Sequence, residues 1–255
     1  MAGRRLDGVV ALVTGASSGI GEATARALAD EGAAVAAVAR RKERLDGLAG
    51  EIARAGGRAL ALRADVTDQA EARAVVERTV AELGRLDILV NNAGVMLLGP
   101  IVGAPTEEWD RMVALNVQGL LYMAHAALPH LLAAAESARR RVADLVNVSS
   151  VAGRRARSGA GVYNLTKFGV GAFSESLRQE VTARHLRVSV IEPGAVETEL
   201  VSHVRPEVRE QSTRTFAHVE MLQAEDIADA IRYVVTRPRH MAINEVLVRP
   251  TEQEF

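Results

Sequence analysis

Short apolar runs alternate along the chain with longer segments in which apolar residues recur every three or four positions. The short runs are rich in valine, alanine and leucine and favour strands, whereas the longer segments have the period of amphipathic helices. The pattern predicts strands at Val9–Val13, Ala33–Ala39, Arg58–Arg63, Leu86–Val90, Val142–Val148, Arg187–Ile191 and Val246–Val248. It predicts helices at Ile20–Asp30, Arg41–Ala55, Asp68–Leu83 with Asp68 and Glu71 as a capping pair, a region capped by Thr106, Asn116–Glu136, Gly161–Ala183 and Glu225–Thr236.

Regular alternation of strands and helices, with strands that are apolar throughout, indicates a parallel sheet covered by helices on both faces. Because crossovers between parallel strands are right-handed, we expect an α/β protein with a doubly wound, Rossmann-type sheet of about seven strands. No linker or repeat divides the chain, so residues 1–255 are expected to form a single domain. The polar segment Thr198–Met221 is expected to be either a lid over a site or an ordinary surface excursion.

Composition narrows the classes of function. The 255 residues carry 31 basic and 32 acidic side chains and a formal net charge of -1, whereas a nucleic-acid-binding module would carry a basic excess. The 48% of hydrophobic and 25% of charged residues are typical of a globular protein. The absence of cysteine excludes disulfides, thiolate metal sites and a cysteine nucleophile. The six histidines have no ligand-like spacing, so no metal site is expected.

The first residues resemble a signal peptide only in part. Arg4 and Arg5 precede an apolar stretch, but Asp7 and Gly8 interrupt it, and Val9–Val13 is too short for the apolar core of a signal peptide. No apolar run approaches the length of a membrane span. We therefore expect a cytoplasmic protein that binds neither membranes nor nucleic acids.

A glycine-rich turn follows the first predicted strand and opens the first predicted helix. Its residues, Thr14-Gly15-Ala16-Ser17-Ser18-Gly19-Ile20-Gly21, have the spacing TGxxxGxG. The glycines let the backbone approach a pyrophosphate, whose charge then lies at the helix N-terminus. A tight turn is the alternative, but its place after the first strand favours a dinucleotide bound by Gly15, Ser17, Ser18, Gly19, Ile20 and Gly21.

The end of the second strand indicates which dinucleotide is bound. A carboxylate there would bind the ribose hydroxyls of NAD, but this chain has Arg40 and Arg41. Two guanidiniums can pair with a 2′-phosphate, assisted by the hydroxyls of Ser17 and Ser18. A solvated helix start is the alternative, although arginine is unfavourable next to a helix N-terminus. The sequence therefore predicts NADP(H) as the cofactor.

Two further turns follow predicted strands. Asp65 and Val66 follow the third strand, where a short polar side chain can meet the adenine amino group; a simple turn aspartate is an equally good interpretation. Asn92, Ala93 and Gly94 follow the fourth strand. Small residues and an amide there would let a cofactor lie close to the sheet edge, and a turn cap is the alternative.

Ser150, Tyr163 and Lys167 carry the expected chemistry. Tyr163 and Lys167 are four residues apart on one predicted helix and share a face, and a neighbouring ammonium can lower the pKa of a phenol, ordinarily about 10, by roughly 1–3 units. Only Lys42 and Lys167 among the 31 basic residues are lysines, which favours a specific need for a compact ammonium over a surface position. Ser150 ends the fifth strand, on the edge where open α/β sheets bind ligands.

Together these residues resemble the short-chain dehydrogenase/reductase superfamily over essentially the whole chain. The matching positions are Gly15, Gly19, Gly21, Asp65, Asn91–Gly94, Asn116, Ser150, Tyr163, Lys167, Pro193 and Gly194. The resemblance implies that Ser150, Tyr163 and Lys167 act on a carbonyl or an alcohol, while Asn116 holds a water that relays protons to the lysine. It also implies that a turn holds the nicotinamide carboxamide, with Pro193, Gly194, Val196 and Thr198 at that site.

Stretches such as Ile191–Gly194 look most like a bacterial subgroup that includes the dehydrogenase reducing clavaldehyde to clavulanic acid and hydroxy-acid dehydrogenases. The resemblance implies reversible, NADPH-dependent reduction of an aldehyde or ketone of a small metabolite by a homotetramer or homodimer. A 3-oxoacyl or polyketide ketoreductase is the alternative enzyme. A non-catalytic NADP-binding scaffold is the alternative from another class.

The outer wall of the site is less defined by the sequence. Arg154, Arg155 and Arg157 follow Ser150 and are expected either to bind a carboxylate or a phosphorylated carrier, or to be solvated. The run Arg139–Arg141 is expected to be a solvated helix end. Expected apolar walls of the substrate pocket are Met96, Leu97, Val151 and Ala152.

Overall fold

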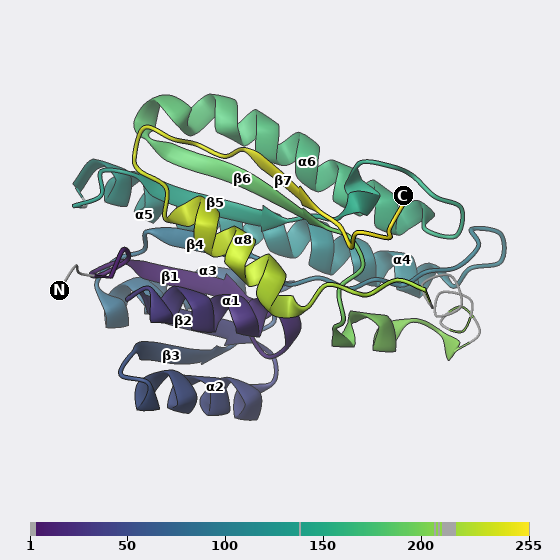
Figure 1. Cartoon of the computed structure of the whole chain (residues 1–255), viewed down its shortest axis with the longest axis horizontal. Coiled ribbons are helices and arrows are strands. Elements are labelled where there is room, and N and C mark those ends of the chain that lie inside the picture. Colours follow the sequence, from purple (N-terminus) through teal and green to yellow (C-terminus); the bar gives the residue numbers. More distant parts are fainter. Residues whose placement is uncertain (1–3, 138, 207, 209, 211–217, 255) are drawn as a thin grey trace.

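The computed structural model describes residues 4–137, 139–206, 208, 210 and 218–254. They form one sheet in the order β3-β2-β1-β4-β5-β6-β7, in which every neighbouring pair is parallel (Figure 1). This confirms the predicted doubly wound, seven-stranded sheet. The strands are β1 (Val10–Thr14), β2 (Ala34–Ala39), β3 (Arg58–Arg63), β4 (Ile88–Asn91), β5 (Ala143–Val148), β6 (Leu186–Pro193) and β7 (Glu245–Val248).

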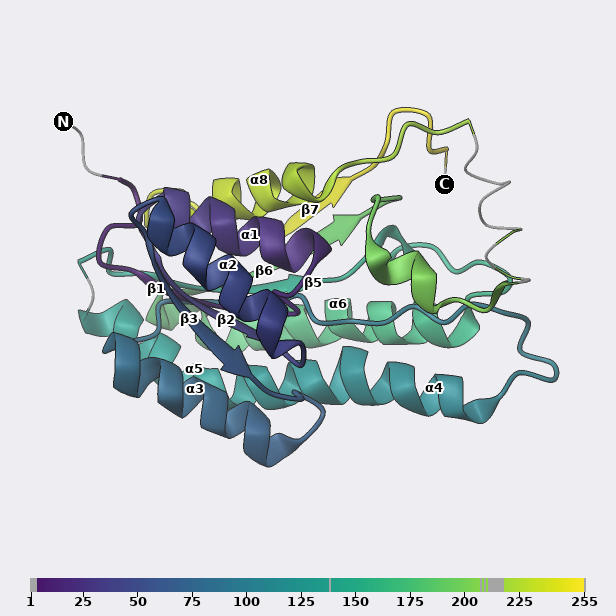
Figure 2. The ribbon, with the colours of Figure 1, turned by 90° about the horizontal axis from the view of Figure 1, so that it is seen from below.

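Helices cover both faces of the sheet (Figure 2). One face packs against α1 (Gly19–Asp30), α2 (Lys42–Arg54) and α8 (Ala224–Val235), and the other against α3 (Gln69–Leu83), α5 (Leu120–Ser137) and α6 (Gly161–Val181). The helix α4 (Thr106–Val113) continues through a π-helical turn, η1 (Ala114–Gly119), into α5; short 3-10 turns are η2 (Val151–Gly153), η3 (Thr182–Arg184) and η4 (Glu199–His203). None of the described helices is both long and apolar enough to cross a bilayer.

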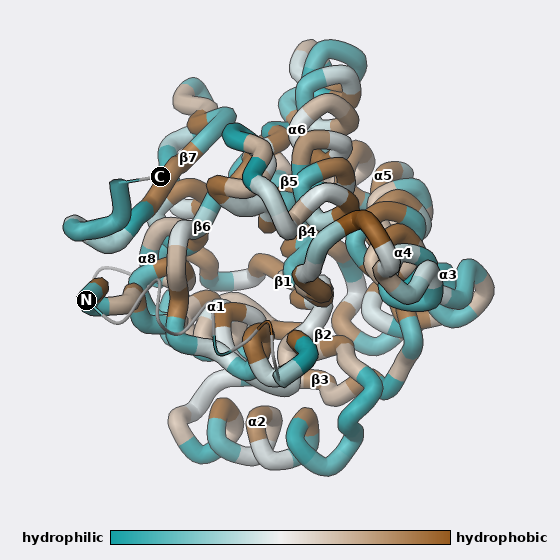
Figure 3. Tube along the Cα trace, turned by 90° about the vertical axis from the view of Figure 1, so that its right-hand side faces the viewer, coloured by the Kyte–Doolittle hydropathy of each residue, from teal (hydrophilic) through white to brown (hydrophobic). Residues whose placement is uncertain are grey.

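The burial of both faces explains why the strands are apolar throughout. In β1, Ala11 and Val13 pack on the side of α1, α2 and α8, whereas Leu12 packs on the side of α3, α5 and α6. Successive side chains of a strand point to opposite faces, so a strand covered on both sides has no polar face. Seen along the sheet in Figure 3, the strands at the centre are largely hydrophobic, and hydrophilic positions lie mainly outside, as on α3.

Most element boundaries lie within two residues of the predicted ones, but α5 begins at Leu120 rather than Asn116, because Ala114–Gly119 form the π-helical turn, and two predicted caps also need correction. Pro105 precedes α4, and Thr106 is its first helical residue without a capping hydrogen bond, so the predicted cap is wrong. Asp68 does cap α3 by accepting hydrogen bonds from two backbone amides of its first turn. Glu71 does not bond back to Asp68, because its carboxylate accepts a hydrogen bond from the amide of Asp65 instead.

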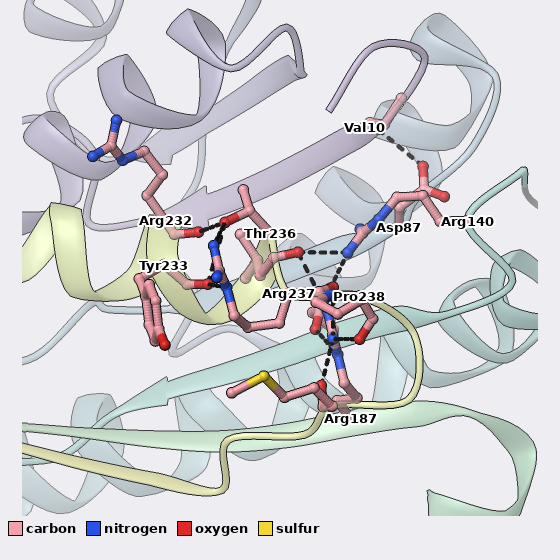
Figure 4. Close-up of polar contacts among 12 residues, drawn as sticks. Val10, Asp87, Arg140, Arg187, Arg232, Tyr233, Thr236, Arg237 and Pro238 are labelled. Carbon is pink, nitrogen blue, oxygen red and sulfur yellow. Dashed lines mark hydrogen bonds and ion pairs between the residues drawn. The ribbon is translucent and has the colours of Figure 1, made fainter. Parts of the chain in front are cut away.

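A buried polar network lies at the edge where the strands begin (Figure 4). Arg187 of β6 donates from Nε to Asp144 Oδ1 at 2.7 Å, and its terminal nitrogens donate to the carbonyls of Val235 and Met241. These bonds tie the end of α8 and the connection to β7 onto the sheet. Arg140 also binds the Asp144 carboxylate and the Val235 carbonyl, so the prediction that Arg139–Arg141 is merely a solvated helix end is wrong for this residue.

This network gives a stability prediction. Arg187→Met should lower the free energy of unfolding by about 3 kcal/mol, because part of a buried carboxylate and the carbonyls of Arg237 and Met241 lose the guanidinium that donates to them. Urea denaturation at fixed protein concentration measures the change. The matched variant Arg78→Met, which breaks an exposed ion pair with Glu82 on α3, should cost less than about 0.5 kcal/mol. Equal losses in the two variants would contradict the assignment.

Candidate active site

A cavity of about 490 Å³ opens at the edge where the strands end, within the range of small-molecule sites. Of the residues selected from the sequence as catalytic or cofactor-binding, only Gly21 and Asn116 do not line it. Among the residues that the structure describes, no group of three or more His, Cys, Asp or Glu side chains could hold a metal ion. The selected residues that line the cavity are Gly15, Ser17, Ser18, Gly19, Ile20, Arg40, Arg41, Asp65, Val66, Asn92, Ala93, Gly94, Ser150, Tyr163, Lys167, Pro193, Gly194, Val196 and Thr198.

The glycine-rich turn forms the floor of one end of the cavity. Gly15 has φ +68°, a conformation that favours glycine. A Cβ at Gly21 would overlap the Gly15 carbonyl oxygen and the side-chain amide nitrogen of Asn92. Gly21 therefore lies behind the turn and lets α1 start close to it. The N-cap of α1, Ser18, makes no side-chain hydrogen bond to the helix, so the first-turn amides have no side-chain cap from it. An anion bound at this end would meet the positive end of the helix.

Thr14 joins this turn to the one after β4. Its Oγ1 accepts hydrogen bonds from the amides of Asn92 and Ala93 at 3.0 and 3.1 Å, and the Asn92 side chain donates to the Thr14 carbonyl at 3.0 Å. Thr14 is not among the predicted site residues, although it is the first residue of the glycine-rich motif. Asn91, by contrast, belongs to β4, and its side chain donates to Asn147 within the protein interior.

Arg41 is the centre of a polar cluster at the end of β2. It donates from Nε to Ser17 Oγ at 3.0 Å and from a terminal nitrogen to Ser18 Oγ at 2.7 Å. Its other terminal nitrogen donates to Glu199 at 2.7 Å, and Arg44 donates to the same carboxylate at 2.6 Å. The sequence placed two arginines and two serines here; Arg44 and Glu199 were missed because no local pattern links α2 to a residue 155 positions away.

Arg40 points to a different partner. Its guanidinium lies 3.7 Å from the carboxylate of Asp65, which also accepts hydrogen bonds from the amide and hydroxyl of Thr67. Although partial burial raises the pKa of Asp65, these two hydrogen bonds and the Arg40 charge outweigh it, and the pKa is lowered overall. Asp65 is therefore an ionised carboxylate at the wall of the cavity.

The three catalytic candidates meet at the other end. Ser150 follows β5; its hydroxyl accepts from the Ala152 amide as the cap of η2 and donates to the Pro193 carbonyl at 3.4 Å, and it lies near enough to Tyr163 to influence the pKa of the phenol. Tyr163 and Lys167 lie on the first turns of α6, with Lys167 Nζ 5.8 Å from the centre of the tyrosine ring. Lys167 Nζ donates to the Val148 carbonyl at 2.9 Å. The structure thus brings together the three side chains that the sequence analysis selected.

Burial dominates the ionisation of this group. It raises the pKa of Tyr163 to about 12, against a smaller lowering by the hydrogen bond with Ser150, and it lowers the pKa of Lys167 to about 8. The spacing of Tyr163 and Lys167 in the sequence instead predicts that the lysine lowers the pKa of the tyrosine. The direction differs because both side chains are buried at 7% exposure and the ammonium is directed to a backbone carbonyl.

Asn116 stands behind the catalytic group, in the π-helical turn η1. Its side-chain amide accepts from the Val95 amide and donates to the Val95 carbonyl, both at 2.8 Å, and it also donates to Thr166 at 3.3 Å. Thr166 in turn donates to the Tyr163 carbonyl. The side chain of Asn116 thus fixes the loop after β4 against α6. π-helical turns occur frequently at functional sites.

The arginines after Ser150 divide into two sets. Arg154 donates to the buried Glu192 at 2.6 Å and to Glu245, and it is not among the residues that line the cavity. Arg155 and Arg157 do line it, and burial together with the charge of Arg155 lowers the pKa of Arg157. Two guanidiniums, that of Arg155 exposed and that of Arg157 half-buried, therefore lie near each other in the wall of the cavity that also holds the catalytic residues.

The apolar wall of the cavity differs from the predicted one at Leu97 and Leu98. Leu97 packs in an apolar core cluster rather than lining the cavity, whereas Met96, Leu98, Val151 and Ala152 do line it. Gln253, near the end of the chain, also lines the cavity, and its side-chain oxygen accepts a hydrogen bond from the Ala195 amide at 2.9 Å. No sequence pattern pointed to Gln253, because it lies outside any predicted element. Part of the excursion Thr198–Met221, at 207, 209 and 211–217, lies outside the described residues.

Comparison with known sequences places these features in a family. A profile of the short chain dehydrogenase family matches residues 9–209. A glycine betaine reductase of Emericella nidulans is 38% identical over 97% of this chain, which corresponds to only 19% of that much longer protein. An uncharacterized oxidoreductase of Staphylococcus aureus is 34% identical, with 94% of this chain and 96% of the relative covered.

Solved structures agree with the sequence comparison. A serine dehydrogenase in its closed form, complexed with NADP+, has a TM-score of 0.88 and 34% identity, with 97% of each chain covered. A 3-ketoacyl-(acyl-carrier-protein) reductase from Brucella melitensis, complexed with NADH, has a TM-score of 0.84 and 32% identity over 98% of this chain and 100% of the other. From the sheet, the cavity residues and the matched profile, this chain belongs to the short-chain dehydrogenase family of oxidoreductases.

Proposed function

We propose that this protein is an NADP(H)-dependent oxidoreductase that reversibly reduces an aldehyde or ketone of a small metabolite to an alcohol. One observation carries the proposal: a single cavity has Ser150, Tyr163 and Lys167 at one end and the cluster around Arg41 at the other. The first group can act on a carbonyl oxygen, and the second can bind a phosphate.

The cofactor end fits a phosphorylated dinucleotide. Gly21 lies behind the turn and lets α1 start close to it, so a pyrophosphate bound at the turn would meet the first amides of α1. Solved relatives were bound to NADP+ or to NADH, so the choice of NADP(H) depends on Arg41 with Ser17 and Ser18, which together suit a 2′-phosphate. Asp65 and Val66 would flank the adenine, and Asn92 to Gly94 and Pro193 to Thr198 the nicotinamide half. When bound, the cofactor supplies the hydride.

The residues at the catalytic end of the cavity would transfer one proton to the substrate. Ser150 hydrogen-bonds the carbonyl oxygen of the substrate, and Tyr163 donates a proton to that oxygen as the carbonyl is reduced. Burial raises the pKa of Tyr163 to about 12, so the phenol carries its proton at neutral pH. Lys167 then stabilises the phenolate. The side-chain amide of Asn116 is taken up by Val95 and Thr166, so a water for the expected proton relay at Asn116 would not be held by that amide.

The substrate end favours a carbonyl compound that also carries a carboxylate. Arg155 and Arg157 lie near each other in the cavity wall, and a carboxylate would offset the repulsion between the exposed guanidinium of Arg155 and the half-buried one of Arg157. This interpretation agrees with the resemblance to the subgroup of clavaldehyde reductase and hydroxy-acid dehydrogenases. The solved neighbour described as a serine dehydrogenase supports the same substrate class.

A 3-oxoacyl ketoreductase is the second candidate. The likeness to the reductase from Brucella melitensis favours it, and Arg155 and Arg157 would then meet the phosphate of a carrier. A non-catalytic NADP-binding scaffold has less support, because the complete group of Ser150, Tyr163 and Lys167 is in place.

Assembly into a C2-based homodimer or a homotetramer is part of the proposal. The helix α6 leaves Leu165 and Phe168 exposed at 64% and 44%, beyond what the sheet face covers. On α8 and β7, Tyr233 and Leu247 are exposed in the same way. A cytoplasmic location belongs to the same proposal.

The first prediction tests catalysis. Tyr163→Phe should reduce turnover by about a hundred- to ten-thousandfold, because the proton donor is lost, and should leave the Kd for NADPH nearly unchanged. Carbonyl-dependent loss of NADPH absorbance measures turnover, and NADPH fluorescence measures binding. The matched variant Tyr233→Phe changes an exposed tyrosine on α8 and should be as active as the wild type. Turnover of Tyr163→Phe within about tenfold of the wild type would contradict the assignment.

The second prediction concerns the cost of burying Lys167. Its pKa is about 8 in the folded chain and ordinarily 10.5, so the unfolded chain binds more protons between these values and stability rises with pH through this window. Lys167→Met should therefore be inactive but more stable than the wild type by roughly 3 kcal/mol at pH 7, a difference that shrinks as pH rises from 8 to 10.5. Urea denaturation at several pH values measures it.

The control for this measurement is the other lysine. Lys42→Met removes an exposed ammonium that pairs with Asp46, so its effect on the free energy of unfolding should be small. If Lys167→Met is no more stable than Lys42→Met at pH 7, burial does not lower the pKa of Lys167.

The third prediction tests the substrate class. Short hydroxy acids should be oxidised with a kcat/KM at least about tenfold above that of their methyl esters, because the ester removes the charge that Arg155 and Arg157 would bind. Replacing both arginines with glutamine should abolish this preference by raising KM for the acids. Arg184→Gln, at an exposed arginine beside Glu136, should keep the preference. Equal use of acids and esters by the wild type would favour the ketoreductase alternative.

A further inference from the structure

Glu199 is the one acidic side chain in the Arg41 cluster that the proposed function does not use. It is the first residue of η4, the turn that begins the excursion after β6. Its two carboxylate oxygens bind two guanidiniums of the α2 region: one accepts from Arg41 at 2.7 Å and the other from Arg44 at 2.6 Å. These hydrogen bonds lower the pKa of Glu199 to about 2, so the carboxylate is charged at neutral pH.

The carboxylate satisfies the same donors that a phosphate would need. Arg41 holds Ser17 and Ser18 with two of its nitrogens and Glu199 with the third. A phosphate monoester carries close to two negative charges at neutral pH and has three strong acceptor oxygens, so it competes well for guanidinium donors. A bound 2′-phosphate and the Glu199 carboxylate would also repel each other if both stayed at Arg41.

We infer that Glu199 is an internal competitor of the cofactor's 2′-phosphate: it occupies Arg41 and Arg44 in the free protein and is displaced when NADP(H) binds. The inference depends on the proposed use of NADP(H). Glu199 therefore weakens binding of phosphorylated dinucleotides selectively, while ligands without a 2′-phosphate leave the two ion pairs intact. It is a residue that sets the preference of the site between NADP(H) and NAD(H).

Displacement of Glu199 would also affect the substrate end of the cavity. Thr198 caps η4 and lies so close to the phosphate turn that a Cβ at Gly19 would be 3.1 Å from its methyl group. Leu200, Val201 and His203 of the same turn line the cavity. Releasing Glu199 frees η4 from α2, so the presence of the 2′-phosphate changes the wall that a substrate meets.

The test uses two ligands that lack the nicotinamide, adenosine 2′,5′-bisphosphate and 5′-AMP, and measures their Kd by calorimetry. Glu199→Gln removes the charge and keeps the shape of the side chain. It should tighten binding of the bisphosphate by about three- to tenfold and leave 5′-AMP unchanged. In the wild type, the bisphosphate but not 5′-AMP should also speed hydrogen exchange of the backbone amides of η4, whereas in Glu199→Gln the exchange should already be fast without ligand.

A second variant separates the effect of the Glu199 contact from the general electrostatic effect of one negative charge near the arginines. Glu43→Gln removes an equal charge from the first turn of α2, at a residue other than Glu199, which holds both Arg41 and Arg44, and should change either Kd by less than about twofold. If Glu199→Gln weakens the bisphosphate or leaves it unchanged, Glu199 orients the arginines or is irrelevant to binding, and the inference is overturned. If the wild type does not prefer the bisphosphate to 5′-AMP at all, the proposed use of NADP(H) fails as well.

Discussion

The whole site depends on one constraint, that all seven strands run in the same direction. Parallel strands bring their carboxyl ends to one edge, and each connection back to the next strand must cross a face of the sheet as a helix. The turns after β1, β2, β4 and β5 therefore meet around one cavity, although they are spread over more than half of the sequence. The same direction of the strands places the Arg187 network at the far edge, where it fastens the last elements without touching the cavity.

Side-chain hydrogen bonds then fix the relative positions of the segments that the sheet brings together. Thr14 holds the turn after β4 to the turn after β1, and Asn116 holds the following loop to α6. Neither side chain needs to touch a ligand to matter, since each fixes the position of backbone that does. The π-helical turn at Asn116 allows its side chain to reach Val95 while α4 continues towards α5.

The sequence was sufficient for features that depend on local pattern. Strands buried on both faces appear as unbroken apolar runs, and the residues that follow them, from Gly15 to Ser150, could be assigned to the cavity edge from their position, whereas Pro193 to Thr198 were assigned through the family resemblance. Contacts between distant segments could not be predicted. The partner of Arg41 is 158 residues away, and Arg140 looked like a surface residue because its acceptors lie on β5 and at the end of α8. The ionisation of Tyr163 was misjudged because desolvation depends on complete burial, which spacing along a helix does not reveal.

The hydrogen bond from Ala195 to Gln253 has a practical consequence. It fixes the C-terminal residues to the turn after β6, where a Cβ at Gly194 would overlap the Gln253 side chain. The first described residues lie at the opposite edge of the molecule (Figure 1). An affinity tag or reporter fused after the last residue would therefore be attached within a few bonds of the cavity wall, whereas the same tag at the amino end would be separated from it by the length of the sheet.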